Sequence, residues 1–317
     1  MKLRILFTWS LLVVIMIGSK QLFSQTELRL NSQASQVDIF IRDQAFTSYL
    51  FGKERSKPVL FPVRAPGGRI ANRIFPFKKD VPGESLDHPH QESVFFAFGD
   101  VGDERLDFWR SHGHDGARIV HRSVLEMKSG ETGLLRVLLD WVDSEGKLVL
   151  QEIRRMEFGG NQDFWWIDHT SRLLADQKSV RLNENKEGLF AIRVSAAFRE
   201  DTGNSQYLDA FGRRGAKAIW GTRAPWLALQ GKLEGDPLTI AIFDHPSSFN
   251  HPAYWHCRDY GLFAVNPLGR RQFVKGSIPI GFEIKLGESL LFRYRLSLYS
   301  KEISKQHLDD DYQKYIR

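Results

Sequence analysis

The sequence predicts an all-β fold, a large β-sandwich followed by a short C-terminal helix. Short apolar runs recur about every 8–15 residues with turn-forming residues between them, which is typical of sandwiches and barrels. Helical periodicity is almost absent until the last stretch, Ser304 to Tyr315, where Ser304 is a suitable N-cap. We find no internal repeat and no low-complexity linker, so residues 25–317 are expected to form one domain.

The first third of the chain is predicted to hold three strands, a long loop and one buried strand. The three strands are Val37–Ile41, Phe46–Phe51 and Val59–Val63. The segment from Arg69 to Leu86 lacks regular patterning, and long loops of this kind in compact domains are often functional. It leads through the polar residues 87–93 into an apolar run, Val94–Val101, which is typical of a buried strand.

The middle of the chain carries the clearest strand pattern. The segments Gly133–Val142 and Lys147–Phe158 flank Asp143-Ser144-Glu145-Gly146, a connection with the length and composition of a hairpin loop. Two further strands are predicted at Asp163–Leu174 and Glu187–Val194. The Gly- and Asp-rich segment Arg199–Arg214 is interpreted as a loop. The remaining predicted strands are short and apolar: Ala218–Gly221, Trp226–Gln230, Leu238–Phe243, Leu262–Val265, Phe282–Ile284 and Leu290–Leu298.

The N-terminus and the composition bear on location and partners. Lys2 and Arg4 precede an apolar run from Ile5 to Gly18, and small Ser24 follows, which is the pattern of a signal peptide over residues 1–24. No later stretch has the ~20 apolar residues of a stable membrane span. We therefore expect an exported protein, periplasmic or secreted. The single cysteine, Cys257, lies far from the signal region, so a lipoprotein anchor is not expected.

Charge argues against a nucleic-acid partner. The formal net charge is +6, and the basic residues are scattered among acids rather than gathered in runs. The chain is rich in aromatic residues, with 23 Phe, 8 Trp and 8 Tyr. Aromatic rings fill large β cores, and they are also the surfaces on which sugar rings pack. A small carbohydrate is therefore the partner that the composition favours.

The segment Asp87-His88-Pro89-His90 is the first cluster whose side chains are suited to catalysis or ligand binding. On an extended backbone, His88 and His90 would leave the same face about 6.5 Å apart along the strand. Two imidazoles so placed are able to share one divalent metal, to bind substrate or to transfer protons. A purely structural role is the third interpretation. Asp87 is expected to contact the substrate or the first histidine.

A pair of charged residues interrupts the apolar face of the predicted strand Lys147–Phe158. Alternation places Leu150, Glu152, Arg154 and Met156 on one face. Glu152 and Arg154 are either a structural ion pair or catalytic groups that line a cleft, with Arg154 neutralising developing negative charge. Glu187, at the start of its strand, is a further catalytic candidate. Arg193 is expected on the face opposite Phe190.

The second cluster is Trp255-His256-Cys257-Arg258-Asp259-Tyr260-Gly261. On an extended chain His256, Arg258 and Tyr260 share a side, and together they supply a titratable group, a cation and a phenol. Lyases acting on acidic sugars need such a trio, and a purely structural cluster is the alternative interpretation. Trp109, Trp255, Arg258 and Tyr260 are candidate substrate-binding residues. No Gly-x-Ser-x-Gly nucleophile motif is present, and Cys257 among aromatics is expected to be buried.

These segments together resemble the DUF6807 family, whose members often carry the label "PmoA family" or "methane oxygenase PmoA". The resemblance runs from about Pro58 to Leu298 and rests on Asp87-His88-Pro89-His90, Phe98-Gly99-Asp100-Val101, Asp107-Phe108-Trp109, Glu152 with Arg154, Glu187-Gly188, Arg193, Asp244-His245-Pro246 and Trp255 to Pro267. It implies exported proteins in sugar-degrading settings, and a galactose-mutarotase-like supersandwich is the form of sandwich expected. Where the family usually has a third histidine, this chain has Gln91.

Three functions are compatible with these residues. The first is an exported carbohydrate-active enzyme that acts on glycosides or oxidised sugars by hydrolysis or elimination. Its catalytic residues would be His88, His90, His256, Glu152, Arg154 and Glu187, and its substrate-binding residues Asp87, Trp109, Arg193, Trp255, Arg258 and Tyr260. The second is a non-catalytic carbohydrate-binding protein. The third, suggested by the family label, is a metal-dependent oxygenase with one divalent metal at His88 and His90.

Overall fold

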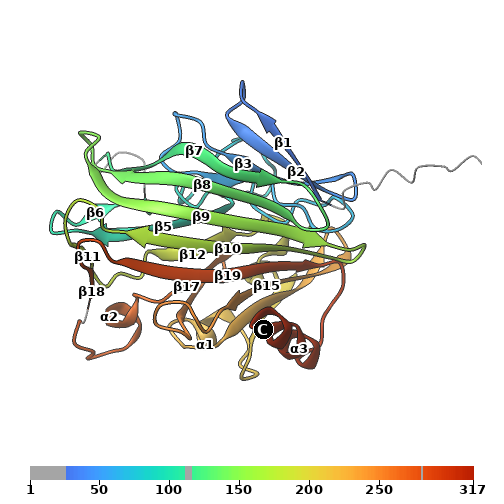
Figure 1. The fold of residues 1–317 in the computed structure, drawn as a ribbon. Helices are drawn as coiled ribbons and strands as arrows, with labels where there is room; N and C mark the ends of the chain where they lie inside the picture. The colour runs from blue at the N-terminus through green and yellow to red at the C-terminus, as the bar shows by residue number, and fades with distance from the viewer. Residues whose placement is uncertain (1–25, 111–115, 280) are drawn as a thin grey trace, which may run out of the picture.

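The protein consists of two large antiparallel β-sheets that pack face to face, with three short helices at the periphery (Figure 1). The structure, a computed structural model, describes residues 26–110, 116–279 and 281–317. The predicted signal peptide lies outside these residues. None of the helices in the described part is long and apolar enough to cross a membrane.

One sheet has eleven strands, in which β1-β2-β3-β4-β5-β12-β17-β16 form the main path and β6, β11 and β18 attach near β5. Their bounds are β1 Thr26–Asn31, β2 Gln36–Ile41, β3 Gln44–Leu50, β4 Val59–Leu60, β5 Val94–Val101, β6 Leu106–Asp107, β11 Val180–Leu182, β12 Gly188–Arg193, β16 Tyr254–Cys257, β17 Leu262–Asn266 and β18 Phe282–Ile284.

The other sheet has eight strands in the order β13-β14-β15-β19-β10-β9-β8-β7, and its long strands cross the front of Figure 1. Their bounds are β7 Arg118–Lys128, β8 Gly133–Val142, β9 Leu148–Gly160, β10 Phe164–Leu174, β13 Ser205–Asp209, β14 Trp226–Leu233, β15 Asp236–Asp244 and β19 Ser289–Tyr299. With eleven and eight strands, the sandwich is much larger than the 7–9-stranded immunoglobulin type. The predicted sandwich is confirmed.

Alternation along the strands builds the core. In β9 the even-numbered residues from Leu150 to Phe158 are buried and face the other sheet, as the pattern predicted. Phe96 of β5 and Phe190 of β12 point toward them, since both rings contact His169 of β10. One continuous cluster of buried apolar side chains fills the space between the sheets.

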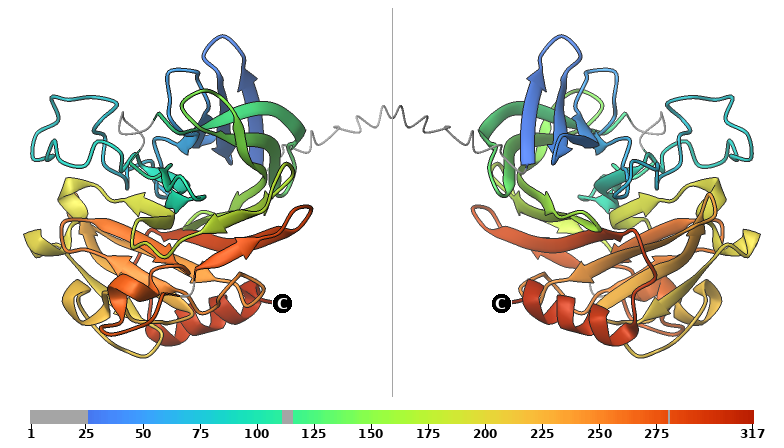
Figure 2. Two further views of the ribbon diagram at one scale, coloured as in Figure 1. Left: turned by 90° about the vertical axis from the view of Figure 1, so that its left-hand side faces the viewer. Right: turned by 90° about the vertical axis from the view of Figure 1, so that its right-hand side faces the viewer.

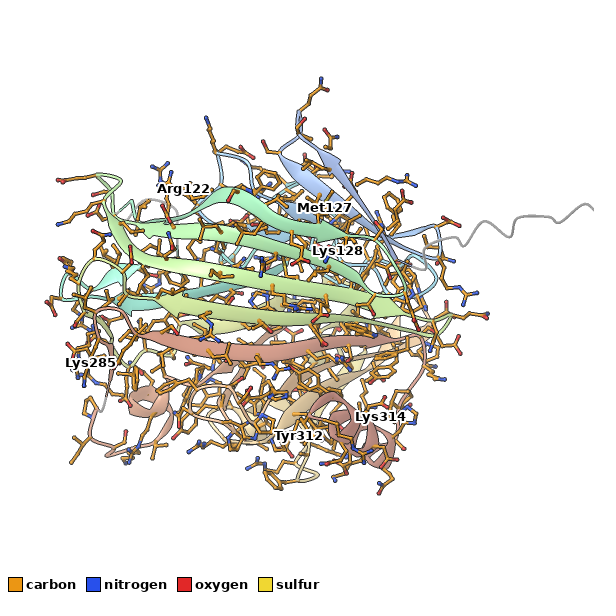
Figure 3. The ribbon with its side chains drawn as sticks, in the orientation of Figure 1. Arg122, Met127, Lys128, Lys285, Tyr312 and Lys314 are labelled. Carbon is orange, nitrogen blue, oxygen red and sulfur yellow. The ribbon has the colours of Figure 1, made fainter. Side chains whose placement is uncertain are left out.

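The edge strand β7 is protected from pairing with other chains. Its register against β8 shifts between His121 and Ser123 and again between Val124 and Glu126. Charged side chains also stand along it, and Figure 3 labels Arg122 and Lys128 on this strand. Bulges and charges are two common ways to blunt a sheet edge.

The C-terminal helix α3, Lys305–Tyr315, is confirmed together with its cap. The Ser304 side chain accepts a hydrogen bond from the backbone N–H of His307 at 3.2 Å. The helix packs on the outer side of the eight-stranded sheet, where Leu308, Tyr312 and Tyr315 join a separate apolar cluster with Trp226 and other residues of β14 and β15 (Figures 1 and 2).

Three predicted elements were wrong. The segment Ala218–Gly221 is not a strand, because helix α1, Ala216–Ile219, forms there when the distant Glu200 carboxylate accepts the N–H of Ala216. The segment Arg199–Arg214 is not wholly a loop, since β13 lies within it and pairs with β14. The strand predicted at Val59–Val63 ends at Leu60, since Pro62 has no N–H for a ladder. Helix α2, Arg270–Phe273, was not predicted.

Candidate functional site

The outer face of the eleven-stranded sheet, the face turned away from the other sheet, carries the candidate site. Strand pairing puts Phe95 of β5, Ala191 of β12, Ala264 of β17 and His256 of β16 in one row across this face. Arg193 lies two residues further along β12 and therefore points to the same side. This confirms that Arg193 and Phe190 occupy opposite faces.

The His-Pro-His segment reaches this face as a turn. The backbone N–H of Gln91 donates to the carbonyl of His88 at 3.0 Å, and His88 has a φ of +44°. The extended backbone expected from the sequence is thus corrected, because the chain folds back on itself at Pro89. The turn still brings the two imidazole rings within 5.6 Å, centroid to centroid, nearly perpendicular to each other.

Arg73, from the long loop, fixes this turn from inside. Its guanidinium donates to the carbonyl oxygens of Asp87 at 2.8 Å, His88 at 2.7 Å and Gln91 at 3.2 Å, and to the Asp87 carboxylate at 2.8 Å. Arg73 is only 2% exposed, and this burial lowers its pKa to about 10. A planar cation with five donors suits this set of acceptors. The turn is therefore rigidly held.

Asp87 is saturated by its partners. Its carboxylate accepts hydrogen bonds from Ser85 at 2.6 Å and Arg193 at 3.1 Å, and it lies 2.8 Å from Nδ1 of His88. Partial burial opposes ionisation, but Ser85, Arg193 and His88 outweigh it and hold the pKa of Asp87 below its usual range. Asp87 therefore orients His88 and stays ionised rather than donating a proton.

Two distant segments meet at Tyr260. Its ring stacks on His88 at 5.3 Å, with the ring planes 11° apart, and the guanidinium of Arg193 lies 4.4 Å from its centroid. Arg193 also donates to the side-chain oxygen of Gln91 at 2.5 Å. The His-Pro-His turn and the segment Trp255–Gly261 thus form one continuous surface, as the sequence analysis anticipated.

Arg258 stands at the edge of this surface between two aromatic rings. Its guanidinium carbon is 5.9 Å from the ring of Trp220 and 5.9 Å from that of Tyr260. The side chain is exposed, and among the residues that the structure describes it makes no ion pair. It therefore offers a positive charge beside two ring faces.

His90 is neutral at physiological pH. Burial lowers its pKa to about 3, and the neighbouring positive charges of Lys57 and Arg110 add to the effect. Lys57 itself is fully buried, with its ammonium 3.0 Å from the carbonyl of Trp109, and burial lowers its pKa to about 8. A neutral imidazole keeps a lone pair that accepts a proton or a hydrogen bond.

His256 lies on the same face but under a cover. Its Nδ1 donates to the carbonyl of Lys186 at 2.9 Å, and the rings of Trp220 and Phe273 lie 6.5 and 5.9 Å away. The residue is 3% exposed, and burial lowers its pKa to about 4. His256 thus supports the neighbouring segment Lys186–Glu187 more directly than it faces solvent.

Glu187 borders this part of the surface. Its carboxylate pairs with the ammonium of Lys186 and lies 4.0 Å from the guanidinium of Arg110. Arg110 is half exposed, and its charge also reaches His90. We call the whole group the outer-face cluster: Asp87, His88, His90, Arg110, Lys186, Glu187, Arg193, Trp220, His256, Arg258 and Tyr260.

Glu152 and Arg154 do not belong to the cluster. Both are buried between the sheets, where Arg154 Nε donates to Glu152 at 2.8 Å. The Glu152 carboxylate also accepts hydrogen bonds from Trp141 Nε1 at 2.8 Å and from Ser171 Oγ at 2.5 Å. The structure thus corrects the expectation that this pair lines a cleft, because β9 turns this face toward the core. Its placement fits the structural interpretation.

The two tryptophans proposed as sugar platforms are buried too. Trp109 packs on Phe95 at 4.7 Å, and Trp255 lies in the core, with its indole N–H donating to the carbonyl of Ala224. Neither ring is open to a ligand. Trp220, which is partly exposed beside Arg258, is the tryptophan on which a sugar ring could pack. Its sequence context gave no signal, because it lies within the segment Ala218–Gly221, which was predicted as a strand.

The arrangement of the side chains gives little support to the expectation that His88 and His90 bind a divalent metal. Nδ1 of His88 already faces Asp87, and the His88 ring is stacked on Tyr260. Within the described ranges, no group of three histidine, cysteine or carboxylate side chains is arranged to hold a metal ion. Gln91, where the resemblance implied a third histidine, is bound to Arg193.

Sequence reasoning missed Arg73, which holds the histidine turn, and Arg110, which belongs to the outer-face cluster. The only available signal for Arg73 was its position in a long irregular loop just before the histidines. Arg110 follows Asp107-Phe108-Trp109, where it carries no motif of its own. Their importance comes from contacts with residues far away along the chain.

Comparisons with solved structures agree with the fold. The galactosidase domain of an α-galactosidase–sucrose kinase, AgaSK, matches with a TM-score of 0.50 and 11% identity over 88% of this chain and 42% of its own. The GH36 α-galactosidase AgaA from Geobacillus stearothermophilus gives 0.41 and 12%, covering 87% and 41%. A galactose mutarotase-like protein from Clostridium acetobutylicum gives 0.39 and 9%, covering 87% and 98%.

The chain spans less than half the length of these galactosidase chains. At such identities the likeness concerns the fold alone. No match is found among the curated proteins. The profile of one family matches residues 36–313, which include every strand of both sheets except β1, the His-Pro-His turn and most of helix α3. The chain therefore belongs to DUF6807, a family of unknown function.

Proposed function

We propose that this protein is an exported carbohydrate-active enzyme that binds an acidic sugar unit at the outer-face cluster and acts on it by proton abstraction and elimination. The observation that carries the proposal is Arg258, an exposed guanidinium beside the rings of Trp220 and Tyr260 with no ion pair among the described residues. A carboxylate on a sugar would pair with the cation while the apolar face of the ring packs on an aromatic side chain.

The fold supports a carbohydrate ligand by analogy. The structure with a TM-score of 0.50 is described as a galactosidase domain. Folds host many activities, so this likeness raises the expectation of a sugar ligand and says nothing about the reaction. The reaction must be argued from the groups of the cluster.

Those groups favour elimination over hydrolysis. Hydrolysis by a carboxyl pair needs one acid that holds its proton, whereas Asp87 is kept ionised by its partners and Glu152 is sealed in the core. Burial lowers the pKa of His90 to about 3, so this imidazole is unprotonated at neutral pH, and the negative charge of a bound sugar carboxylate would raise that pKa and make the imidazole a better proton acceptor. Elimination from an acidic sugar needs an acceptor for the proton next to the carboxylate and a cation to stabilise the resulting negative charge.

Roles follow from these positions. Arg258 would bind the sugar carboxylate, His90 would accept the proton, and the phenol of Tyr260 would supply a donor beside His88. His256 would act as a positioning residue through the carbonyl of Lys186. Arg73 and Asp87 would hold the histidine turn in place before substrate arrives, which is the preorganisation that catalysis requires.

The test is a panel of uronic acid glycosides and their neutral counterparts incubated with the purified protein. Elimination would appear as ultraviolet absorbance from a new conjugated double bond, and hydrolysis as new reducing ends without that absorbance. We expect His90→Gln to lower turnover at least about 100-fold, within the range for loss of a general base, with an unchanged melting temperature. His307→Gln on helix α3 is the matched control.

Two results would count against the proposal. If uronides bind and are never altered, the protein is a sugar-binding module, which was the alternative left by the sequence. If neutral glycosides bind as well as uronides, and Arg258→Gln changes neither, the assignment of an acidic sugar is wrong.

A further inference from the structure

A second hollow lies beside the outer-face cluster. It has a volume of about 470 Å³, which is within the range of small-molecule sites, and its walls include Glu184, Arg223, Phe249, Tyr254, Arg270 and Phe282. Tyr254 and His256 are two residues apart on β16, so both side chains point to the outer face of the sheet. The hollow is thus on the same side of the molecule as the cluster.

Glu184 is the unusual residue of this pocket. It is 8% exposed, yet its Oε2 is shielded from solvent and finds no hydrogen-bond partner in the described part of the chain. A buried carboxylate oxygen without a donor costs stability, and such groups are rare in folded proteins. Because Glu184 lines the pocket, a rotation of its carboxylate would bring Oε2 within reach of a hydroxyl donated by a ligand there.

The other walls of the pocket include aromatic rings whose positions are fixed by contacts with neighbouring residues. Phe249 and Phe282 lie 4.5 Å apart, and the guanidinium of Arg223 lies 5.3 Å from the ring of Tyr254. Arg223 also donates to the carbonyl of Pro252 at 2.6 Å, which ties the adjacent loop down. These contacts hold the walls in place.

The side chain of Phe273 contacts both the pocket and the cluster. The ring of Phe273 lies 5.6 Å from Tyr254 and 5.9 Å from His256. The backbone links the two places as well, since Glu184 precedes by two residues the Lys186 carbonyl that accepts from His256. A ligand that fills both places would therefore pass over one aromatic ring.

We infer that the pocket is a subsite for an uncharged pyranose ring, whose hydroxyl donates to Oε2 of Glu184 and whose apolar face packs on the aromatic wall. A second acidic ring is disfavoured there, because its carboxylate would meet that of Glu184. This inference rests on the proposed function, and it names the substrate class: a glycoside that joins one acidic ring, at the cluster, to one neutral ring, at Glu184.

Binding to the full chain tests the inference with three probes, namely glucuronic acid, xylose, and the disaccharide in which the two are joined. Affinities are measured by calorimetry, with saturation-transfer NMR for xylose. We expect the disaccharide to bind at least about tenfold more tightly than glucuronic acid, since hydrogen bonds to charged groups have effects of this size. Glu184→Leu, which removes both acceptor oxygens, should abolish that gain and leave glucuronic acid binding unchanged.

Glu145→Leu, at an exposed hairpin turn, is the matched control and should keep the gain. The melting temperature of free Glu184→Leu should equal or exceed that of the wild type, because an unsatisfied buried oxygen has been removed. The inference is overturned if glucuronic acid binds while the disaccharide gains nothing, or if Glu184→Leu keeps the gain. Xylose binding that is lost in Glu184→Leu, with no binding of glucuronic acid, would support the pocket and refute the acidic-sugar site.

Discussion

The core pair Glu152–Arg154 and the outer-face cluster contain the same residue types in opposite settings. In the core, Arg154, Trp141 and Ser171 together satisfy the Glu152 carboxylate, and the group is closed to solvent. On the outer face, buried arginines hold a turn while Arg258 and His88 stay open. The comparison shows that an arginine near an acid indicates a functional surface only where the guanidinium still has hydrogen-bond donors free for a ligand.

Breaking the core pair should have the largest effect on stability. Arg154→Met leaves the Glu152 carboxylate buried without its cation, and we expect a loss of about 3–5 kcal/mol in the free energy of unfolding. Denaturant titration measures it. The double variant Glu152→Gln with Arg154→Met keeps an acceptor for Trp141 and Ser171 and should recover most of the loss. A double variant no more stable than Arg154→Met would contradict the structural interpretation.

Changing Arg73, which holds the His-Pro-His turn, should have the second-largest effect on stability. Arg73→Lys retains the charge but loses the fork of donors that binds three carbonyl oxygens and Asp87. We expect a loss of about 2–3 kcal/mol, together with loss of ligand binding at the cluster. Calorimetric unfolding and titration with glucuronic acid would show both. If a folded Arg73→Lys variant still bound glucuronic acid, the Arg73 guanidinium would not be required to hold the turn for binding.

Acid should destabilise the outer face through its histidines. Burial lowers the pKa of His90 to about 3 and that of His256 to about 4, so the unfolded chain takes up protons first, near pH 6.5. Stability should therefore fall as pH decreases from about 6.5 to about 4, by at most about 1.4 kcal/mol per pH unit for each group. His256→Gln should flatten the slope, and the exposed His307→Gln should not. Equal slopes in all three proteins would refute this assignment.

Arg258 should show the smallest effect on stability. Its side chain is exposed, so Arg258→Gln should change the free energy of unfolding by less than about 0.5 kcal/mol. Binding of an acidic sugar should nevertheless be lost. This result, the reverse of that for Arg154→Met, would sharpen the contrast between the two regions. A destabilised Arg258→Gln variant would place Arg258 among structural residues.

Much of the fold follows from local patterning. The hairpin of β8 and β9, the buried run of β5 and the cap of α3 depend on neighbours in the chain, and all three were predicted from them. Helix α1 and strand β13 were not, because each depends on a distant partner: the Glu200 carboxylate for the helix and β14 for the strand.

By itself, the sequence determined the sandwich, the alternation that puts Glu152 and Arg154 on one face and Arg193 opposite Phe190, and the presence of two polar clusters. Only the tertiary structure decided which faces meet the core. It turned the Glu152 face inward, buried Trp109 and Trp255, and stacked Tyr260 on His88. The physical reason is that a period of two separates the faces of a strand without saying which one another sheet will cover.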